Sequence, residues 1–406
     1  MIALPAMCLK YSSPAISLDV FLNFVFISIF YYKGLFKNFK RNFKKFPLHW
    51  YYVFAILSLL CSSIFSIIPF TSLITSLIFY LISDFLIPIM FFILYNRYQN
   101  IIYLYLKWSM IIFSITAIYG IVEFLIGQNI ILDYIINNVP EDQLLGKLYL
   151  GGERLGLRRI NSLYVSPNNI IYGAFIASLA NAYNLSHHGK KLKYVTIFTF
   201  LALFVVILAN SRTVLISSLI ILFPVFVLSK QSIKYVTISV LILFIAAPFL
   251  LQYIANITSV FASSHSSQAI EGSSFDMRLE QLAASYLLFI KSPIFGNGFQ
   301  SVNYFLSDEG GMAYVLRGAE SIWFVLLIER GILGLIAYLS MFAIMAKRYK
   351  IFKDSIFLFY VIGYLVSNTM SSMPGFSMSF LYITTFILDK ILNNNKNVKN
   401  RLNYNS

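Results

Sequence analysis

Long apolar runs separated by short polar breaks dominate the chain. A transmembrane helix needs roughly 20 consecutive apolar residues, and most of these runs approach that length. The runs lie at about residues 15–32, 48–68, 73–95, 108–127, 165–184, 194–209, 213–228, 235–254, 329–346, 355–373 and 376–391. The pattern predicts an all-α polytopic membrane protein with about eleven transmembrane helices. The apolar segment before residue 15 is too short to span the membrane by itself, but a twelfth transmembrane crossing stays open.

Two breaks in this pattern are too long to be simple turns. They cover about residues 128–164 and 255–328, and the second is the largest predicted non-membrane segment. The chain is thereby divided into N-terminal spans, a first loop, central spans, a large second loop, and C-terminal spans with a tail, at residues 1–127, 128–164, 165–254, 255–328 and 329–406. We expect function to reside at the two loops, since loops held by rigid helices carry many binding residues.

A surface helix is expected inside the second loop. Ser273 and Asp276 resemble a helix start signal, and an apolar stripe at helical spacing follows. The stripe consists of Met277, Leu282, Ala283, Tyr286, Leu287 and Ile290. The run ends at Lys291-Ser292-Pro293, so we expect an amphipathic helix that lies along the outer membrane surface.

The composition agrees with a membrane protein. Of 406 residues, 59% are hydrophobic and only 12% are charged, against roughly 25% charged in a soluble domain. Soluble multidomain enzymes and disordered regulators are therefore excluded. Two cysteines, Cys8 and Cys61, make neither a secreted disulfide scaffold nor a metal cluster, and the four histidines have no spacing that makes a metal site.

The net charge of +15 is unevenly distributed. Lysines and arginines dominate alternate breaks, which predicts that those breaks face the cytoplasm. These breaks lie at residues 33–45, 97–107, 190–193, 230–234, 347–353 and 390–401. The other breaks hold most of the acids and face the opposite side. The charge distribution thus reflects the orientation of the protein in the membrane. A nucleic-acid role has no support, because no basic stripe is interleaved with exposed aromatic residues.

Five stretches in fixed order resemble the O-antigen polymerase and O-antigen ligase superfamily of lipid-linked glycan transferases. They are Arg158-Arg159-Ile160-Asn161-Ser162 with Ser166-Pro167-Asn168-Asn169; Asn210-Ser211-Arg212-Thr213; Asp276-Met277-Arg278; residues 293–299; and Ala319-Glu320-Ser321 followed by residues 329–334. The resemblance covers about residue 155 to the last span. It implies a multi-span fold of the C-type glycosyltransferase (GT-C) kind. It also implies action on undecaprenyl-diphosphate-linked sugars at the periplasmic face of a bacterial inner membrane, without metal, cofactor or nucleotide sugar.

Arg212 is the first candidate for holding the diphosphate leaving group, as a catalytic residue. Arginine offers a permanent charge and a planar fork that matches phosphate oxygens. Asn210 or Ser211 can cap the span that starts near Thr213, so the positive end of that helix points to the same place as the guanidinium. The alternative is that Arg212 only reaches the lipid headgroups. A charge in so short a turn is costly, however, when it is unused.

Arg158 and Arg159, with Asn168 and Asn169, are candidates for binding a sugar or phosphate. A Ser-Pro pair directly before the asparagines predicts a helix start with both amides in its first turn at the water boundary. Two adjacent arginines cannot easily face one ligand. One of them can instead pair with Glu153.

The second loop holds the remaining candidates. Glu320 is the available general base, where many ligase-type members of the superfamily show a His-Asn pair, and Ser321 stands beside it. Arg278 is a further catalytic candidate. Arg317, Ser321 and, beside Arg212, Ser211 are candidates for binding the substrate. The structural alternatives are a salt bridge between Arg278 and a nearby acid, and an ion pair in which Glu320 clamps Arg317 or Arg330.

Glu329 and Arg330 lie next to each other at the start of an apolar run. Arg330 is a candidate substrate-binding residue, although mutual charge compensation with Glu329 is the simpler interpretation. The following Gly331 and Gly334 predict a break between a re-entrant helix from about residue 319 and a true span.

Three acids fall inside predicted spans: Asp19, Asp84 and Glu123. A charge in lipid is costly, so each should face the interior of the bundle. Asp84 is the deepest of them and could pair with an inward-turning arginine.

The sequence hypothesis is a polymerase that transfers the growing glycan from undecaprenyl diphosphate to the next lipid-linked repeat unit. Membrane lipid surrounds it, and a chain-length regulator is left open as a partner. The nearest alternative is a ligase that transfers the glycan to lipid A-core, against which the missing histidine beside Ser321 argues mildly. A flippase or transporter is a third hypothesis. Transporters commonly show related halves and broken helices at the midplane, whereas this chain shows one oversized outer loop.

Overall fold

The computed structural model describes residues 18–37, 39–98, 100–138, 153–154, 157–164, 166–186, 191–228, 275–306, 310–316, 321–349, 351–370 and 378–404. Helices make up most of this part of the chain. Its strands are β1 (Glu153–Arg154) and β2 (Leu157–Arg158), which pair antiparallel as a small hairpin. The predicted all-helical class is therefore confirmed for the described residues, with this hairpin as the exception.

The helical elements follow one another as α1 (Leu18–Tyr32), α2 (Phe39–Lys45), α3 (His49–Ile64), α4 (Phe70–Tyr80), the π-helix η2 (Leu81–Leu86), α5 (Ile87–Arg97), α6 (Ile101–Ile126), α7 (Ile130–Asn138), the 3₁₀-helix η3 (Pro167–Ile170), α9 (Ile171–Ser186), α10 (Val195–Leu208), α11 (Arg212–Leu228), α13 (Phe275–Lys291), α14 (Ser301–Phe305), α15 (Ala313–Leu316), α16 (Ile322–Tyr349), the 3₁₀-helix η4 (Ile351–Lys353), α17 (Ser355–Met370) and α18 (Met378–Tyr404).

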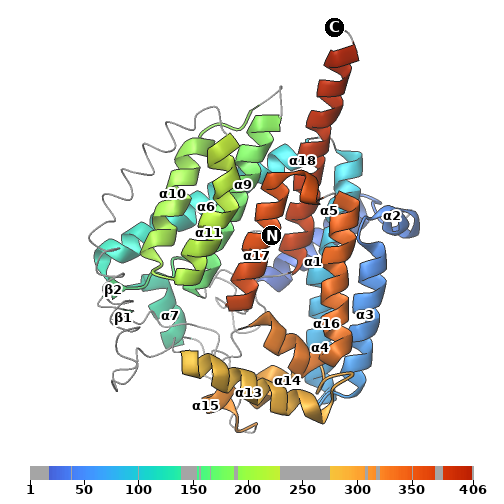
Figure 1. Ribbon diagram of the computed structural model, residues 1–406, viewed down its shortest axis with the longest axis vertical. Coiled ribbons are helices and arrows are strands. Elements are labelled where there is room, and N and C mark those ends of the chain that lie inside the picture. Colours follow the sequence, from blue (N-terminus) through green and yellow to red (C-terminus); the bar gives the residue numbers. More distant parts are fainter. Residues whose placement is uncertain are drawn as a thin grey trace.

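The two ends of the bundle differ in character (Figure 1). The end that we call the basic end holds α2, the turn between α9 and α10, and the C-terminal half of α18. The opposite end, the α13 end, holds α7, the β hairpin and α13 to α15. Three of the lysine-rich breaks that the charge pattern predicts to face the cytoplasm thus lie at the same end of the described bundle, as alternating spans require, whereas residues 230–234 lie outside the described residues.

The described residues contain three helices long and apolar enough to cross a membrane: Phe70–Arg97, Ile101–Ile126 and Ile322–Tyr349. The bent pair α2 and α3, with 103° between its two helices, makes a fourth if it counts as one span. Other predicted spans are shorter apolar helices, including α10 and α17. At about 1.5 Å per residue these fall short of a roughly 30 Å hydrocarbon core. The membrane class is supported, whereas the count of about eleven spans stays a prediction. The predicted span 235–254 lies outside the described residues.

Helix α9 is the centre of the core. It packs against α6, α10, α11 and α18, and every residue from Ile171 to Tyr183 is buried. A helix that is apolar all round belongs in such a position. Asn181 on α9 donates to Thr199 Oγ1 of α10 at 2.9 Å, a buried polar contact of the kind that fixes helix pairs within membranes. The core packing of α9 and this bond fix its position relative to α10.

The orientation of the bundle can be tested with two tyrosines at opposite ends. Tyr134 on α7 is 66% exposed at the α13 end, and Tyr194 in the turn before α10 is 74% exposed at the basic end. Because lysine-rich breaks stay inside, a membrane-impermeant maleimide applied to intact spheroplasts should label Tyr134→Cys and spare Tyr194→Cys. Cys8 and Cys61 are replaced by alanine in both variants, and detergent should expose both sites equally. The reverse labelling pattern would contradict the assignment of sides.

Candidate functional site

Two sequence motifs meet where η3 contacts the start of α11. Ser166 caps η3 as predicted, its hydroxyl accepting a hydrogen bond from the backbone N–H of Asn168 at 3.3 Å. The hydroxyl of Ser211 donates to Oδ1 of Asn168 at 2.7 Å. Helix α11 begins at Arg212, one residue before the predicted start. The structure thus brings Asn168, Ser211 and Arg212 together, although they lie more than forty residues apart in sequence.

Asn169 stands directly behind this contact. Its side chain is fully buried, and neither the nitrogen nor the oxygen of its amide has a hydrogen-bond partner among the described residues. A buried polar group without a partner costs roughly 1–3 kcal/mol. Arg212 is half-buried at the start of α11, which contacts η3, and its Nε is shielded from solvent. A buried amide without a partner calls for an explanation, and a bound ligand would provide one.

The segment that carries Arg159 is anchored by Glu123. The Glu123 carboxylate is buried and accepts the backbone N–H groups of Asn161, at 3.1 Å, and Ser162, at 2.6 Å. Ser162 has a φ of 55°, and its hydroxyl donates to the carbonyl of Thr116. The prediction that Glu123 faces the bundle interior is therefore confirmed, and its charge holds the chain that leads to η3.

The two adjacent arginines take different positions. Arg158 is in β2, and the register of the hairpin sets it opposite Glu153. Arg159 follows the strand and is buried, with 9% of its surface exposed. Arg159 thus turns into the protein beside the segment held by Glu123.

A second group of residues surrounds a break in α16. Gly331 has φ 58° and ψ −154°, which separates a short helix, residues 322–330, from the following span. The loop 292–299 satisfies the backbone groups that the break frees: Ile332 N–H donates to Pro293 O at 2.9 Å, and Asn297 N–H donates to Ile328 O at 2.8 Å. The break predicted from Gly331 is confirmed, and hydrogen bonds from loop 292–299 stabilise it.

Arg330 lies inside that second group. Its guanidinium carbon is 5.1 Å from the ring centre of Tyr80 and 5.6 Å from that of Phe299. It also interacts electrostatically with Asp84, which is buried on η2. The carboxylate of Glu329 accepts the backbone N–H groups of Gln300 and Val302 at the start of α14. Arg330 therefore joins α16 to α4 and to the loop, and Asp84 faces the interior near an arginine as predicted.

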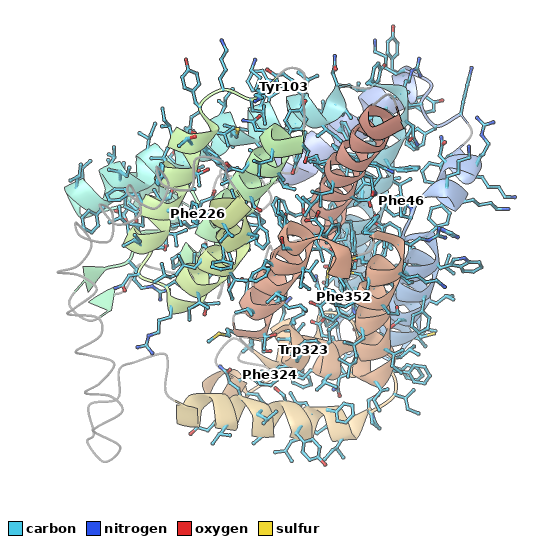
Figure 2. All side chains as sticks on the ribbon, turned by 45° about the horizontal axis from the view of Figure 1, so that its top comes forward. Phe46, Tyr103, Phe226, Trp323, Phe324 and Phe352 are labelled. Carbon is cyan, nitrogen blue, oxygen red and sulfur yellow. The ribbon has the colours of Figure 1, made fainter. Side chains whose placement is uncertain are left out.

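Several predicted residues cannot be placed in this way. Arg317 and Glu320 lie outside the described residues, and Arg278 is placed only as part of the α13 backbone. Ser321 is buried, and its carbonyl accepts the N–H of Phe324 at 3.1 Å at the start of α16. Figure 2 shows Phe324 and Trp323 at this point, next to α13.

Sequence reasoning missed three residues of the α16 break. Ser62 donates to the carbonyl of Glu329 at 2.6 Å, and Ser66 donates to the carbonyl of Phe299 at 3.4 Å. Tyr80 stacks under Arg330. In the sequence, Ser62 and Ser66 are only small polar residues at the end of an apolar run, and this pattern does not identify their partners.

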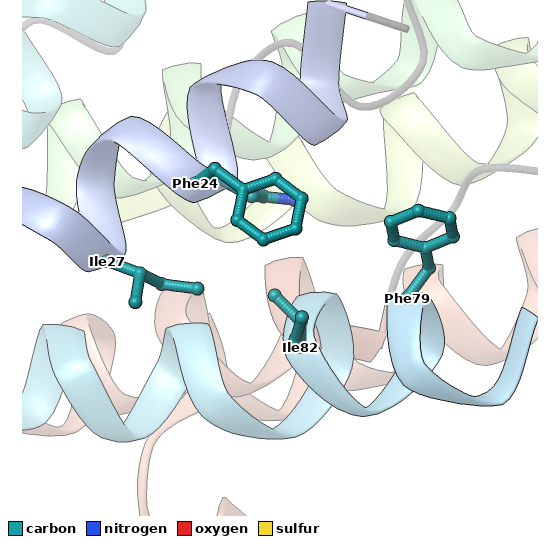
Figure 3. A pocket seen from close by; sticks show the side chains of 5 residues that line it. Phe24, Ile27, Phe79 and Ile82 are labelled. Carbon is teal, nitrogen blue, oxygen red and sulfur yellow. The ribbon is translucent and has the colours of Figure 1, made fainter. Parts of the chain in front are cut away.

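A small hollow between α1 and α4 has no part in either group. It is lined by Asn23, Phe24, Ile27, Phe79 and Ile82 (Figure 3). None of these side chains is charged, so the hollow offers nothing that could hold a diphosphate. Within the described part of the chain no cluster of three or more His, Cys, Asp or Glu could hold a metal ion.

The loop at the α16 break provides a stability prediction. Gly296 and Gly311 both have positive φ, 73° and 64°. A Cβ at Gly296 would collide with the backbone of Glu329 and Arg330, whereas one at Gly311 would meet nothing within 4 Å. Both alanine variants should lose about 1–2 kcal/mol from the left-handed backbone. Gly296→Ala should lose about 2 kcal/mol more of folding stability, because loop 292–299 must shift away from α16. Equal thermal shifts in detergent would show that the loop does not support the break.

Comparison with protein families gives a match over the second half of these elements. Residues 197–339 match the family model described as O-antigen ligase. The match covers about a third of the chain and supports the O-antigen polymerase and ligase superfamily. The matched region contains four of the five resembling stretches, while the Arg158–Asn169 stretch precedes it. A comparison with curated proteins gives no match.

The matched region therefore includes Ser211, Arg212 and the α16 break. It packs widely against the rest of the chain, and α9 lies against both α10 and α11. Two of its polar contacts with the N-terminal part of the chain involve candidate site residues: the hydrogen bond from Ser211 to Asn168 and the contact of Arg330 with Tyr80.

Proposed function

We propose that the chain is a polymerase of a surface polysaccharide such as O-antigen. It transfers the growing glycan from undecaprenyl diphosphate to the next lipid-linked repeat unit at the periplasmic face of the inner membrane. The observation that carries this proposal is the meeting of η3 with the start of α11, through the 2.7 Å bond from Ser211 to Asn168. The element that carries the buried Asn169 amide thus contacts the N-terminus of α11, which carries Arg212, and residues 197–339 match the O-antigen ligase model.

In this proposal the donor is held by Arg212 and Asn169. A diphosphate has oxygens in the geometry of the arginine fork, and the N–H groups at the start of α11 favour the same negative charge. The Asn169 amide offers both a donor and an acceptor, which suits a sugar hydroxyl pair. Arg159 and Arg278 supply further positive charge, and arginines rather than a metal ion neutralise the leaving group.

The acceptor is activated by Glu320, with Arg317 and Ser321 close by in sequence. The acceptor oxygen bonds to the anomeric carbon of the donor as the bond from that carbon to the diphosphate oxygen breaks. The acceptor proton passes to the Glu320 carboxylate, and the diphosphate leaves with its charge held by Arg212. We assign Arg330 a supporting role at the α16 break, because its guanidinium lies over Tyr80 and Phe299.

A ligase that transfers the glycan to lipid A-core is the second candidate, favoured by the description of the matching family. One reaction mixture separates the two. Purified protein receives lipid-linked repeat units with and without lipid A-core. A polymerase forms a ladder of longer lipid-linked products in both mixtures. A ligase forms no ladder and requires lipid A-core for any transfer. Loss of repeat units to the other side of vesicles, without new bonds, would identify a transporter.

A further inference from the structure

Helix α13 lies across the α13 end of the bundle, crosswise to α3 and α16 (Figure 1). One side of it packs inward. Ala284 and Leu288 are buried in a small core with Val302, Leu316 and Ile328. This core attaches α13 to α14, α15 and the short first part of α16.

The opposite side of α13 is apolar and uncovered by the described residues. Its large side chains are between 47% and 61% exposed: Leu279, Leu282, Tyr286, Leu287 and Ile290. At 3.6 residues per turn these positions fall on one continuous arc of the helix, which we call the apolar arc. A soluble surface rarely presents a contiguous patch of this kind without a partner.

Charged residues border the arc on one edge. Glu280 and Lys291 are exposed and are separated by about three helical turns, so they lie on the same edge. An interfacial helix shows this arrangement, with its apolar arc in the acyl chains and a charged edge in water. A helix covered by a second protein copy has no need for such a one-sided border.

The arc is continuous with helices that are candidate membrane spans by length and composition. The ring of Phe295, just after α13, stacks on Phe65 at 5.0 Å. Phe65 follows α3, and its neighbours Ile64 and Phe70 are 78% and 73% exposed at the ends of α3 and α4. These two helices belong to a candidate bent span and to the candidate span Phe70–Arg97. The same apolar surface thus runs from the spans onto α13.

We propose that the apolar arc of α13 is a membrane-docking surface whose occupant is the acyl chains of the bilayer. The helix lies in the interfacial layer, with Glu280 and Lys291 in water and Leu287 and Ile290 in lipid. Through loop 292–299 this docking also sets the depth of the α16 break, because that loop is hydrogen-bonded to both sides of the break.

Nitroxide scanning in proteoliposomes of phosphatidylethanolamine and phosphatidylglycerol tests the proposal. Spin labels replace Leu287, Ile290, Glu280 or Lys291 in a chain whose Cys8 and Cys61 are alanine. The ratio of oxygen accessibility to nickel-chelate accessibility should be several-fold higher at Leu287→Cys and Ile290→Cys than at Glu280→Cys and Lys291→Cys. High nickel-chelate accessibility at the arc would overturn the proposal. Labels on the arc that neither reagent reaches would also overturn it and indicate a protein partner.

A second readout avoids the cysteine background. In Leu287→Trp, acyl-chain-brominated lipid should quench fluorescence beyond the quenching of the three native tryptophans, and Glu280→Trp is the matched control on the charged edge. Equal quenching in the two variants would contradict the membrane position of the arc.

Discussion

Arg212→Ala is expected to abolish polymer formation while the protein remains inserted at normal abundance. The guanidinium is proposed to hold the charge that develops on the departing diphosphate, and loss of one such contact lowers turnover by roughly 10²-fold or more. Turnover is measured with purified lipid-linked repeat units, and abundance by quantitative immunoblotting of membranes.

Two companion variants distinguish a specific role of Arg212 from a general effect of removing positive charge. Arg212→Lys should restore little activity, because an ammonium cannot reproduce the fork. Arg348→Ala removes an exposed arginine at the basic end and should leave polymer unchanged. Wild-type chain lengths in Arg212→Ala would remove Arg212 from the site.

Glu320→Gln is expected to reduce turnover by roughly 10²-fold or more with little change in donor binding, because glutamine keeps the shape of the side chain but cannot accept the proton. If Glu320 only forms an ion pair with Arg317 or Arg330, the same variant should instead lose thermal stability or donor affinity. Its turnover at saturating donor should then be near normal. Turnover, donor binding and thermal shift are measured on one preparation.

Normal turnover in Glu320→Gln would move the proton acceptor elsewhere, with Asp276 and His265 as the next candidates. It would also fit a reaction in which the diphosphate leaves with electrostatic help alone.

The local features of the site were predictable from the sequence because they depend on short-range chemistry. A Ser-Pro pair before two asparagines predicts a capped helix start, and Ser166 caps η3 in the structure. A glycine at the start of an apolar run predicts the break at Gly331. The apolar stripe of the second loop predicts α13, which spans Phe275–Lys291.

Long-range packing was not predictable. The sequence indicates charge compensation between Arg330 and Glu329, and the two interact electrostatically in the structure, but the sequence does not indicate that the guanidinium also packs on Tyr80 of α4. Which tyrosine an arginine meets depends on how helices from distant parts of the chain pack together, and no local pattern records this. The number of spans is uncertain for a related reason, since helices of 14 to 17 residues such as α10 and α11 satisfy an apolar pattern without reaching full bilayer length.

The most direct test of the donor site at η3 and α11 is donor binding together with thermal stability in Asn169→Ala. Removing a buried amide that has no partner among the described residues should leave the melting temperature unchanged or raise it. Binding of the lipid-linked repeat unit should nevertheless weaken by about tenfold or more. The control is Asn181→Ala on the following helix α9, which breaks the bond to Thr199 and should lower stability without affecting binding. Unchanged donor binding in Asn169→Ala, with a melting temperature lowered as in the control, would contradict the placement of the donor at this turn.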